Sequence, residues 1–535
     1  MRKKYLIIIP FFLLALASCR RAKVNNSQTI LSTPEETIVE DNKEIKKKEI
    51  QFFNDSNTYK FSNFVIPTYF FDNSVIPYIS IGDYINNMSI VTNKLTISHD
   101  NDKYSYSVNK NNEKIEMVLD PINDTIEIND YDFVSIDELE YTILDGYKKN
   151  LRMETTYELE STTQKIDLSK YNFDIKEVEG KAVIPFHVIN TIFSLSSYYF
   201  SVYLGDRYVG LSYDDGVYRL KNKYTPTYDL SNEYLEYNYN YIDFMFNEIY
   251  GLKEYFNYNI SNMLNKYRTK LLDKTKTSTG MLEFITDLND PHTGVFDVDF
   301  LSNNVYYNIQ SERDTQILNI RNDLRTRKPY SSYTKISNDT AIIPFDSFYV
   351  NEENGANIRI MNQLNECKED GIKNVVFDVT TNGGGDTFSL AQILGLMTND
   401  DIVLTSTNVK TNSITKETFK VDANYDGDFT DLDAYTEFDY YILSSGYSYS
   451  CANEFINYCK TNNLATIIGN RSGGGACSIY PVVLPTGFYF QTSGLCVFLD
   501  ENGYMTELGI DPDITIDYSK LYDYDSIIEA ISRKN

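Results

Sequence analysis

The sequence predicts a multidomain protein in which an α/β core follows a helical segment and a β-rich α+β N-terminal domain. The chain has 535 residues, which is enough for roughly two to four domains. Short β-rich runs separated by Asn- and Asp-rich turns fill residues 51–225. Beyond residue 338, apolar strand-like runs alternate with helix-like segments, a pattern typical of an α/β layer with partly parallel strands.

Residues 1–18 have the pattern of a secretory signal peptide. Three basic residues at positions 2–4 precede an apolar run over residues 5–17 that is too short for a comfortable membrane span. The run ends in Leu-Ala-Ser-Cys at residues 16–19, which resembles the lipobox of bacterial lipoproteins. The resemblance implies an extracytoplasmic protein anchored to the cell membrane by a lipid on Cys19. The alternative is an ordinary signal peptide in which Cys19 is incidental.

Residues 19–50 are polar, include a run of three lysines and lack a sustained apolar period. We therefore expect them to form a flexible tether.

The composition also limits the partners of the chain. Its 49 basic and 76 acidic residues give a net charge of -27, which repels phosphate backbones, so no nucleic-acid partner is expected. The cysteines after Cys19 show no CxxC spacing, which disfavours a zinc site.

Residues 51–225 contain an internal repeat. Val-Ile-Pro-Tyr at residues 75–78 recurs as Val-Ile-Pro-Phe at residues 183–186, and each copy is followed by apolar residues at helical spacing. This pattern predicts two copies of a strand-helix unit with Pro near the helix start. Residues 226–295 carry apolar and aromatic residues at helical spacing, which predicts two or three helices that end in a loop carrying His292.

The chain has three histidines, and only one of them lies in a position suited to catalysis. His99 falls in a polar strand-turn stretch, and His187 occupies an apolar position of the repeat, so both are interpreted as structural. His292 lies between Pro291 and Gly294 in a loop after the helical block. A single loop histidine is more often structural than functional, so this pattern alone does not assign a role.

Two strand-to-helix turns in residues 296–535 could serve acyl-transfer chemistry. The first, residues 380–385, contains three consecutive glycines whose N–H groups could face an anion. Because it lacks GK[ST] and GxGxxG, an oxyanion hole is a better use than phosphate binding, and a merely tight turn is the alternative. The second turn, residues 444–454, could expose a serine hydroxyl, although Ser448 or Ser450 could simply cap the following helix.

Five motifs in a fixed order resemble the tail-specific, or carboxyl-terminal processing, serine peptidase family. They are Asp290-Pro291-His292, the Asn-Gly-Gly-Gly turn at residues 382–385, the turn at residues 448–453, Ile-Gly at residues 468–469 with Ser-Gly-Gly-Gly at residues 472–475, and residues 507–513. The resemblance spans roughly residues 233–516. It implies a crotonase-like core, protein or peptide substrates, and peptide-bond hydrolysis through an acyl-enzyme that requires no cofactor.

The sequence resembles one branch of this family better than the others. Better-known members use a Ser-Lys dyad, but residues 469–476 contain Arg471 and no lysine, and arginine cannot act as a base near neutral pH. The tricorn-like and chlamydial-protease-like branch is the better match. It implies Ser450 as nucleophile, His292 as general base and Glu507 as the residue that orients the imidazole. It also implies an oxyanion hole formed by Cys451 with Gly384 or Gly383.

Two alternatives remain open. Cys451 could be the nucleophile because a thiolate is intrinsically more reactive than a hydroxyl, although the resemblance favours Ser450. The core could also be degenerate, in which case the protein would be a cell-surface binding lipoprotein. Too few residues separate His292 from residue 338 for the PDZ module common in this family, so recognition of substrate C-termini is not expected.

Residues 422–433 match the calcium loop of an EF-hand or dockerin. The five oxygen-bearing positions are Asp422, Asn424, Asp426, Asp428 and Asp433. Oxygen ligands at alternating positions and a glycine at position six are what a calcium loop requires. The loop lacks a partner hand and ends in Asp rather than a bidentate Glu. A structural calcium ion and a plain acidic turn therefore both remain open.

Overall fold

A computed structural model describes most of the chain. The described residues are 35–40, 43–57, 59, 61–88, 95–110, 112–132, 149–159, 162–195, 199–212, 220, 223–295, 310–351, 353–429 and 432–533. The predicted signal peptide and Cys19 lie outside them. Within this part of the chain, no helix is both long enough and apolar enough to cross a membrane.

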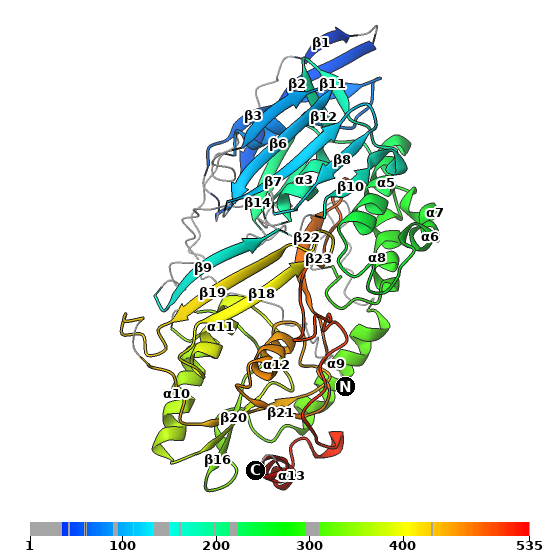
Figure 1. The fold of residues 1–535 in the computed structure, drawn as a ribbon. Helices are drawn as coiled ribbons and strands as arrows, with labels where there is room; N and C mark the ends of the chain where they lie inside the picture. The colour runs from blue at the N-terminus through cyan, green and yellow to red at the C-terminus, as the bar shows by residue number, and fades with distance from the viewer. Residues whose placement is uncertain are drawn as a thin grey trace.

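The N-terminal sheet contains most of the strands before the helical segment (Figure 1). Its order is β11 (Lys176–Val178), β12 (Lys181–Pro185), β4 (Tyr78–Ser80), β3 (Phe64–Phe71), β2 (Lys43–Asn54), β14 (Arg207–Ser212) and β13 (Tyr199–Tyr203), with β1 (Glu35–Glu40) paired to β2. A second, five-stranded sheet has the order β10 (Gln164–Asp167), β8 (Thr125–Ile128), β7 (Glu113–Asp120), β6 (Lys103–Lys110) and β5 (Thr96–Asp100). The 3-10 helix η1 (Leu168–Tyr171) follows β10.

The repeated sequence pattern corresponds to two strand-helix units that lie side by side. Strand β4 leads into α1 (Ile81–Ile85), and β12 leads into α3 (Phe186–Ser194). The two strands pair antiparallel, with Ile184 opposite Ile79. Both isoleucines are fully buried, so each copy covers apolar surface of the other.

The prediction of a tether up to residue 50 is wrong for residues 35–40 and 43–50, which form β1 and most of β2. Ile45 and Ile50 of β2 are buried, so apolar side chains hold this strand in the sheet. The lysine run is compatible with a sheet strand because its long side chains contact other residues of the sheet region. Lys47 donates to Glu179 at 2.8 Å, and Lys48 lies over the Phe70 ring at 5.6 Å.

Four helices lie between residues 226 and 295 in the described chain, rather than two or three. They are α5 (Asn232–Glu248), α6 (Ile260–Asn265), α7 (Arg268–Leu271) and α8 (Thr277–Asp287). Ser231 caps α5 by accepting a hydrogen bond from the Tyr234 N–H. Phe246 of α5 stacks on Phe490 of a C-terminal strand, so the helices share one core with distant sequence.

The C-terminal region is built on a mostly parallel sheet. Its order is β15 (Thr334–Lys335), β16 (Thr340–Pro344), β17 (Asn374–Asp378), β20 (Asp439–Ser444), β21 (Thr466–Gly469) and β24 (Ile514–Thr515), and only β15 runs antiparallel to its neighbour. Helices α10 (Ala356–Glu369), α11 (Thr387–Gly395) and α12 (Cys451–Thr461) pack on one face, and α9 (Glu312–Arg327) and α13 (Tyr524–Ser532) pack on the other. The 3-10 helix η3 (Tyr518–Lys520) precedes α13. This is the predicted alternation of strands and helices.

A fourth sheet connects the two ends of the molecule, and Figure 1 shows it between the N-terminal sheets and the parallel sheet. Its order is β22 (Cys477–Val483), β23 (Tyr489–Phe498), β18 (Ile402–Asn408), β19 (Ile414–Val421) and β9 (Leu151–Glu158). Strand β9 pairs with β19 along its whole length. The predicted boundary that separates residues 51–225 from residues 296–535 is therefore wrong at β9. An edge strand pairs through its backbone, so its sequence does not reveal its partner.

Candidate active site

Ser450 lies at the junction between β20 and α12. Strand β20 ends at Ser444, and the following turn is held against the end of β17 by hydroxyl groups. Ser445 donates to the Thr380 carbonyl at 2.7 Å, and Ser448 donates to the Val379 carbonyl at 2.9 Å. Ser448 is therefore a buried structural residue, which leaves Ser450 as the serine of this turn whose hydroxyl has no such role.

The backbone of Ser450 is strained. It occupies the N-cap position of α12 with φ 56° and ψ -124°, and its side chain takes no capping hydrogen bond from the described residues. An L-residue in this region costs roughly 1–3 kcal/mol and persists only where the surroundings enforce it. The Ser450 N–H donates to the Gly474 carbonyl at 2.8 Å, which helps to fix this conformation. The alternative, in which the Ser450 hydroxyl caps the helix, is therefore not what the described chain shows, and the hydroxyl remains available for other chemistry.

Glycines permit the close packing around Ser450. A Cβ atom on Gly384 would lie 2.7 Å from the Ser450 Cβ and 2.9 Å from the Cys451 nitrogen. The Gly384 N–H donates to Asn382 Oδ1 at 2.8 Å, and the Asn382 amide donates in turn to the Phe345 carbonyl. In this conformation the Gly384 N–H is therefore already used. Cys451 is the first residue of α12, where a helix supplies no acceptor for the N–H group.

The Cys451 side chain is placed differently from the Ser450 hydroxyl. Cys451 is buried, and its thiol lies 3.6 Å from the Asp386 carbonyl. Burial raises the pKa of the Cys451 thiol well above its usual value, and the nearby Asp386 and Glu454 act in the same direction. The thiolate is the reactive form of cysteine, so this environment disfavours Cys451 as a nucleophile.

His292 lies in the loop after α8, and this loop is fixed to the bridging sheet. Gly294 exchanges two backbone hydrogen bonds with Gln491 of β23. Asp290 accepts from the His292 N–H at 2.9 Å and from the Thr293 hydroxyl at 2.6 Å. The imidazole is buried against the Tyr449 ring, with centroids 4.8 Å apart. The loop therefore places His292 beside the residue that precedes Ser450.

The imidazole of His292 has unused hydrogen-bonding capacity. Neither ring nitrogen has a hydrogen-bond partner among the described residues. Burial lowers the pKa of His292 to about 4, Asp290 opposes this shift, and Arg313 adds to it. The ring is therefore neutral at physiological pH. A buried polar group without a hydrogen-bond partner destabilises the folded state by roughly 1–3 kcal/mol. Such groups are rare in folded proteins, and an unpartnered imidazole is consistent with a site that binds a further molecule.

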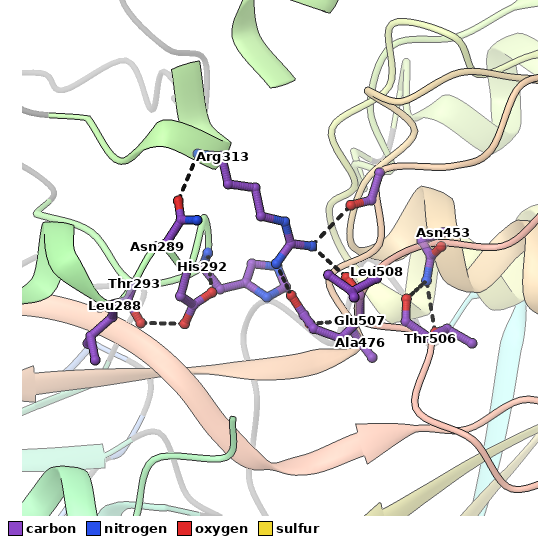
Figure 2. Close-up of polar contacts among 12 residues, drawn as sticks. Leu288, Asn289, His292, Thr293, Arg313, Asn453, Ala476, Thr506, Glu507 and Leu508 are labelled. Carbon is purple, nitrogen blue, oxygen red and sulfur yellow. Dashed lines mark hydrogen bonds and ion pairs between the residues drawn. The ribbon is translucent and has the colours of Figure 1, made fainter. Parts of the chain in front are cut away.

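Glu507 is completely buried and bonded on both oxygens. Its Oε2 accepts from the Ala476 N–H at 2.9 Å, and its Oε1 accepts from Arg313 Nη1 at 2.6 Å. Burial raises the pKa of Glu507 to about 7, against the opposing effect of Arg313. Figure 2 shows the imidazole of His292 beside the Arg313–Glu507 pair.

The three predicted catalytic side chains thus gather in one region without forming a connected triad. No hydrogen bond joins His292 to Ser450 or to Glu507 within the described residues. Sequence reasoning missed Arg313, which belongs to the polar start of α9. Nothing in its local sequence marks it, because its partner Glu507 is 194 residues away.

The other two histidines have structural surroundings. His99 stacks on Tyr104, and His187 is buried against Tyr237.

The predicted calcium loop brings three carboxylates together. Oxygens of Asp422, Asp426 and Asp433 lie within 4.8 Å of one another, whereas Asp428 is not part of this group. The Asn424 side chain donates to Asp426 and to Asp433, each at 3.0 Å. Residues 430–431 of the loop lie outside the described residues. Carboxylate and amide oxygens are the ligands that calcium prefers.

Comparison with known proteins supports the peptidase interpretation for the C-terminal region. The model of peptidase family S41 matches residues 339–516, a segment that includes Ser450 and Glu507 and excludes His292. No curated protein matches the chain.

Several solved structures are similar to parts of the chain. Mature CPAF complexed with lactacystin has 11% identity and a TM-score of 0.41, and the match covers 57% of this chain and 98% of that one. A lipoprotein from Streptococcus agalactiae has 15% identity and a TM-score of 0.36, with 56% and 96% covered. The tricorn protease has 12% identity and a TM-score of 0.33, with 94% and 60% covered. Similarity at this level carries no functional argument.

Proposed function

We propose that this chain is an extracytoplasmic serine endopeptidase, anchored by a lipid on Cys19, that cleaves protein or peptide substrates. Ser450 is the nucleophile, His292 the general base and Glu507 the carboxylate that orients the imidazole. The observation that carries the proposal is the strained Ser450 at the strand-to-helix junction, whose hydroxyl makes no capping bond in the described chain. Its position inside the segment that matches peptidase family S41 supports the same assignment.

The proposed reaction proceeds through an acyl-enzyme. The Ser450 oxygen attacks the carbonyl carbon of the scissile bond while its proton passes to His292. The imidazolium then donates this proton to the leaving amine, and the C–N bond breaks. In the second half, His292 takes a proton from water while the water oxygen attacks the ester carbonyl. The bond between the acyl carbon and the Ser450 oxygen then breaks, the proton passes from His292 to Ser450, and the carboxylic acid product leaves. Because His292 is neutral above about pH 4, it can accept the proton at physiological pH.

The site must tighten before this reaction can occur. The unpartnered ring nitrogens of His292 must reach Ser450 on one side and Glu507 on the other. Catalytic hydrogen bonds are often long or absent in a free enzyme and form only when substrate binds. Each Glu507 oxygen accepts one bond from the described residues and has room for a second, so the carboxylate can also receive the imidazole N–H.

Backbone N–H groups would stabilise the oxyanion. The Cys451 N–H lies at the start of α12, where the helix dipole favours negative charge. The Gly384 N–H donates to Asn382, so Gly383 is the better candidate for the second donor. We expect the core to have the crotonase-like topology implied by its sequence motifs.

Of the two alternatives, catalysis by Cys451 is disfavoured by the buried, high-pKa thiol. A degenerate binding lipoprotein has no specific observation in its favour.

The decisive experiment compares single substitutions on an unfolded protein substrate. Ser450→Ala and His292→Ala should each lower kcat by several orders of magnitude, because the members of a triad act as a unit. Glu507→Gln should cost less, about 10⁴-fold in kcat. Cys451→Ala is the matched control and should stay within roughly tenfold of the parent chain, since only its N–H takes part. An inactive Cys451→Ala and an active Ser450→Ala would show a cysteine peptidase.

We also propose that residues 422–433 hold a structural calcium ion that plays no part in catalysis. The proposal is supported by the approach of Asp422, Asp426 and Asp433 to within 4.8 Å. Asp422 is buried and already accepts the Gly427 N–H at 2.8 Å, so the loop is shaped around this carboxylate. Calcium bound only by the folded chain would raise its stability by mass action.

A further inference from the structure

Arg313 links the elements that carry the proposed catalytic residues. Its Nη1 forms the ion pair with Glu507, and its Nη2 donates to the carbonyls of Glu507 and Gly473. Its backbone N–H donates at 2.7 Å to Asn289, three residues before His292. A capping box between Ser311 and Asp314 fixes the start of α9, and therefore the direction of the Arg313 side chain.

The Glu507 carboxylate needs a cation to remain charged. Its side chain has no exposed surface, and that of Arg313 is only 13% exposed. Moving a carboxylate out of water favours its neutral form unless an opposite charge or hydrogen bonds compensate. A neutral acid at this position could not stabilise an imidazolium, so the surroundings of Glu507 decide whether it can assist His292.

We propose that Arg313 is a positioning residue that keeps the Glu507 carboxylate ionised and correctly oriented for His292. This inference rests on the proposed peptidase function, because Arg313 acts on the reaction only through Glu507. Arg313 holds both the side chain and the main chain of Glu507, so it fixes where the carboxylate lies as well as its charge. A guanidinium is suited to this task because its two terminal nitrogens donate separately to the carboxylate and to the carbonyl of Glu507, whereas a lysine could reproduce only the charge.

The remaining ionisable groups around Glu507 do not replace Arg313. Asp290 raises the pKa of Glu507, as like charges do, and the neutral imidazole of His292 adds no compensating charge. Tyr250, Tyr449 and Cys477 are buried with pKa values raised well above the ordinary range, so they too are neutral. Among the described groups that shift the pKa of Glu507, Arg313 is the cation. Its removal should therefore move the pKa of Glu507 clearly above 7.

The first test is the pH profile of kcat/KM for Arg313→Ala and Arg313→Lys. Glu507 must be ionised, so activity is lost as the pH falls through its pKa, and a higher pKa moves the acid limb to higher pH. At pH 7, the first unit of upward shift from a pKa of about 7 lowers the ionised fraction of Glu507, and with it kcat/KM, roughly fivefold, and each further unit lowers it about tenfold. We expect Arg313→Ala to show at least the first of these losses and to recover towards alkaline pH. Arg313→Lys should lie between Arg313→Ala and the parent chain.

Arg325→Ala is the matched control, since Arg325 lies on the same helix and pairs with Asp346 at 3.5 Å at the surface. It should leave the pH profile unchanged. In a Glu507→Gln background, Arg313→Ala should cause no further loss of kcat, because its effect passes through the charge that has already been removed. An unshifted acid limb, or an additive double mutant, would overturn the proposal. A rise in activity would show instead that Arg313 restrains Glu507.

A second measurement does not depend on turnover. The measurement is an infrared difference spectrum at pH 8 between Arg313→Ala and the double variant Arg313→Ala, Glu507→Gln. This spectrum should contain the C=O stretch of a protonated carboxyl group. The corresponding difference between the parent chain and Glu507→Gln should contain it only weakly, because at a pKa of about 7 roughly a tenth of Glu507 is protonated at pH 8. A band that is no stronger in the first difference than in the second refutes the role of Arg313. If the band follows the prediction but Ser450→Ala leaves the activity unchanged, the peptidase assignment fails and the Arg313–Glu507 linkage stands.

Discussion

Replacing Ser450 by glycine should stabilise the protein while abolishing catalysis. At φ 56° and ψ -124°, Ser450 occupies a region that glycine enters freely and other residues enter at a cost of roughly 1–3 kcal/mol. Glycine also gains conformational freedom in the unfolded chain, which opposes folding by about 0.5–1 kcal/mol. The difference leaves Ser450→Gly about 1 kcal/mol more stable than the parent chain.

Ser450→Ala separates the backbone effect from the loss of the hydroxyl. Alanine retains the Cβ atom and therefore the strain, and the deleted hydroxyl makes no capping bond in the described chain. Its free energy of unfolding should stay within about 0.5 kcal/mol of the parent value. Both variants should be inactive as peptidases, so that only their stabilities differ.

The assay is urea denaturation followed by fluorescence, with midpoints compared at equal slope. Ser526 lies in the first turn of helix α13, where its N–H and hydroxyl both donate to Asp523, and it provides the helical control. There, Ser526→Gly should be about 1 kcal/mol less stable than Ser526→Ala, the usual order for a helix. At Ser450 the order should reverse. If Ser450→Gly is no more stable than Ser450→Ala, the backbone of Ser450 is not strained, and the main support for its role as nucleophile is lost.

Three further predictions concern pH, calcium and the membrane. The activity kcat/KM should fall as the pH drops through about 7, because Glu507 has a pKa of about 7 and His292 has a pKa of about 4. A fall in activity only near pH 4 would contradict control by Glu507. Calcium should raise the melting temperature of the parent chain but not that of Asp426→Ala, and an unchanged melting curve in millimolar calcium would leave only an acidic turn. Cys19→Ala should release the protein from the membrane fraction with its activity intact, and equal retention of this variant would refute the lipid anchor.

The local features of the fold could be predicted from the sequence because they depend on neighbouring residues. The apolar run that forms β17, the glycine-rich turn after it and the strand-to-helix junction at Ser450 all leave local patterns. The same applies to the repeated units β4–α1 and β12–α3, whose similarity is visible as a repeated string. The order of the motifs was enough to predict a serine peptidase and to name the residues that the structure gathers in one region.

The features that the sequence did not predict depend on contacts between distant residues. The lysine run of β2 favours a flexible tether when only the sequence is considered, because Glu179 and Phe70 cannot be matched to it by pattern. Strand β9 was assigned to the N-terminal domain, yet it completes a sheet with β19 more than 250 residues later. Backbone pairing at a sheet edge is largely independent of side-chain identity, so many edges are compatible with one strand sequence.

For the candidate site, the sequence by itself determined which residue types are present and the turns on which they lie. Only the tertiary structure decided the charge, the hydrogen-bond partners and the backbone conformation of these residues. It buries Glu507 against Arg313, leaves the imidazole of His292 without a partner among the described residues, and places Ser450 in a strained conformation. Charge state and strain arise from desolvation and packing by segments far apart in the chain. No local pattern records these contacts, because they exist only once the segments have come together.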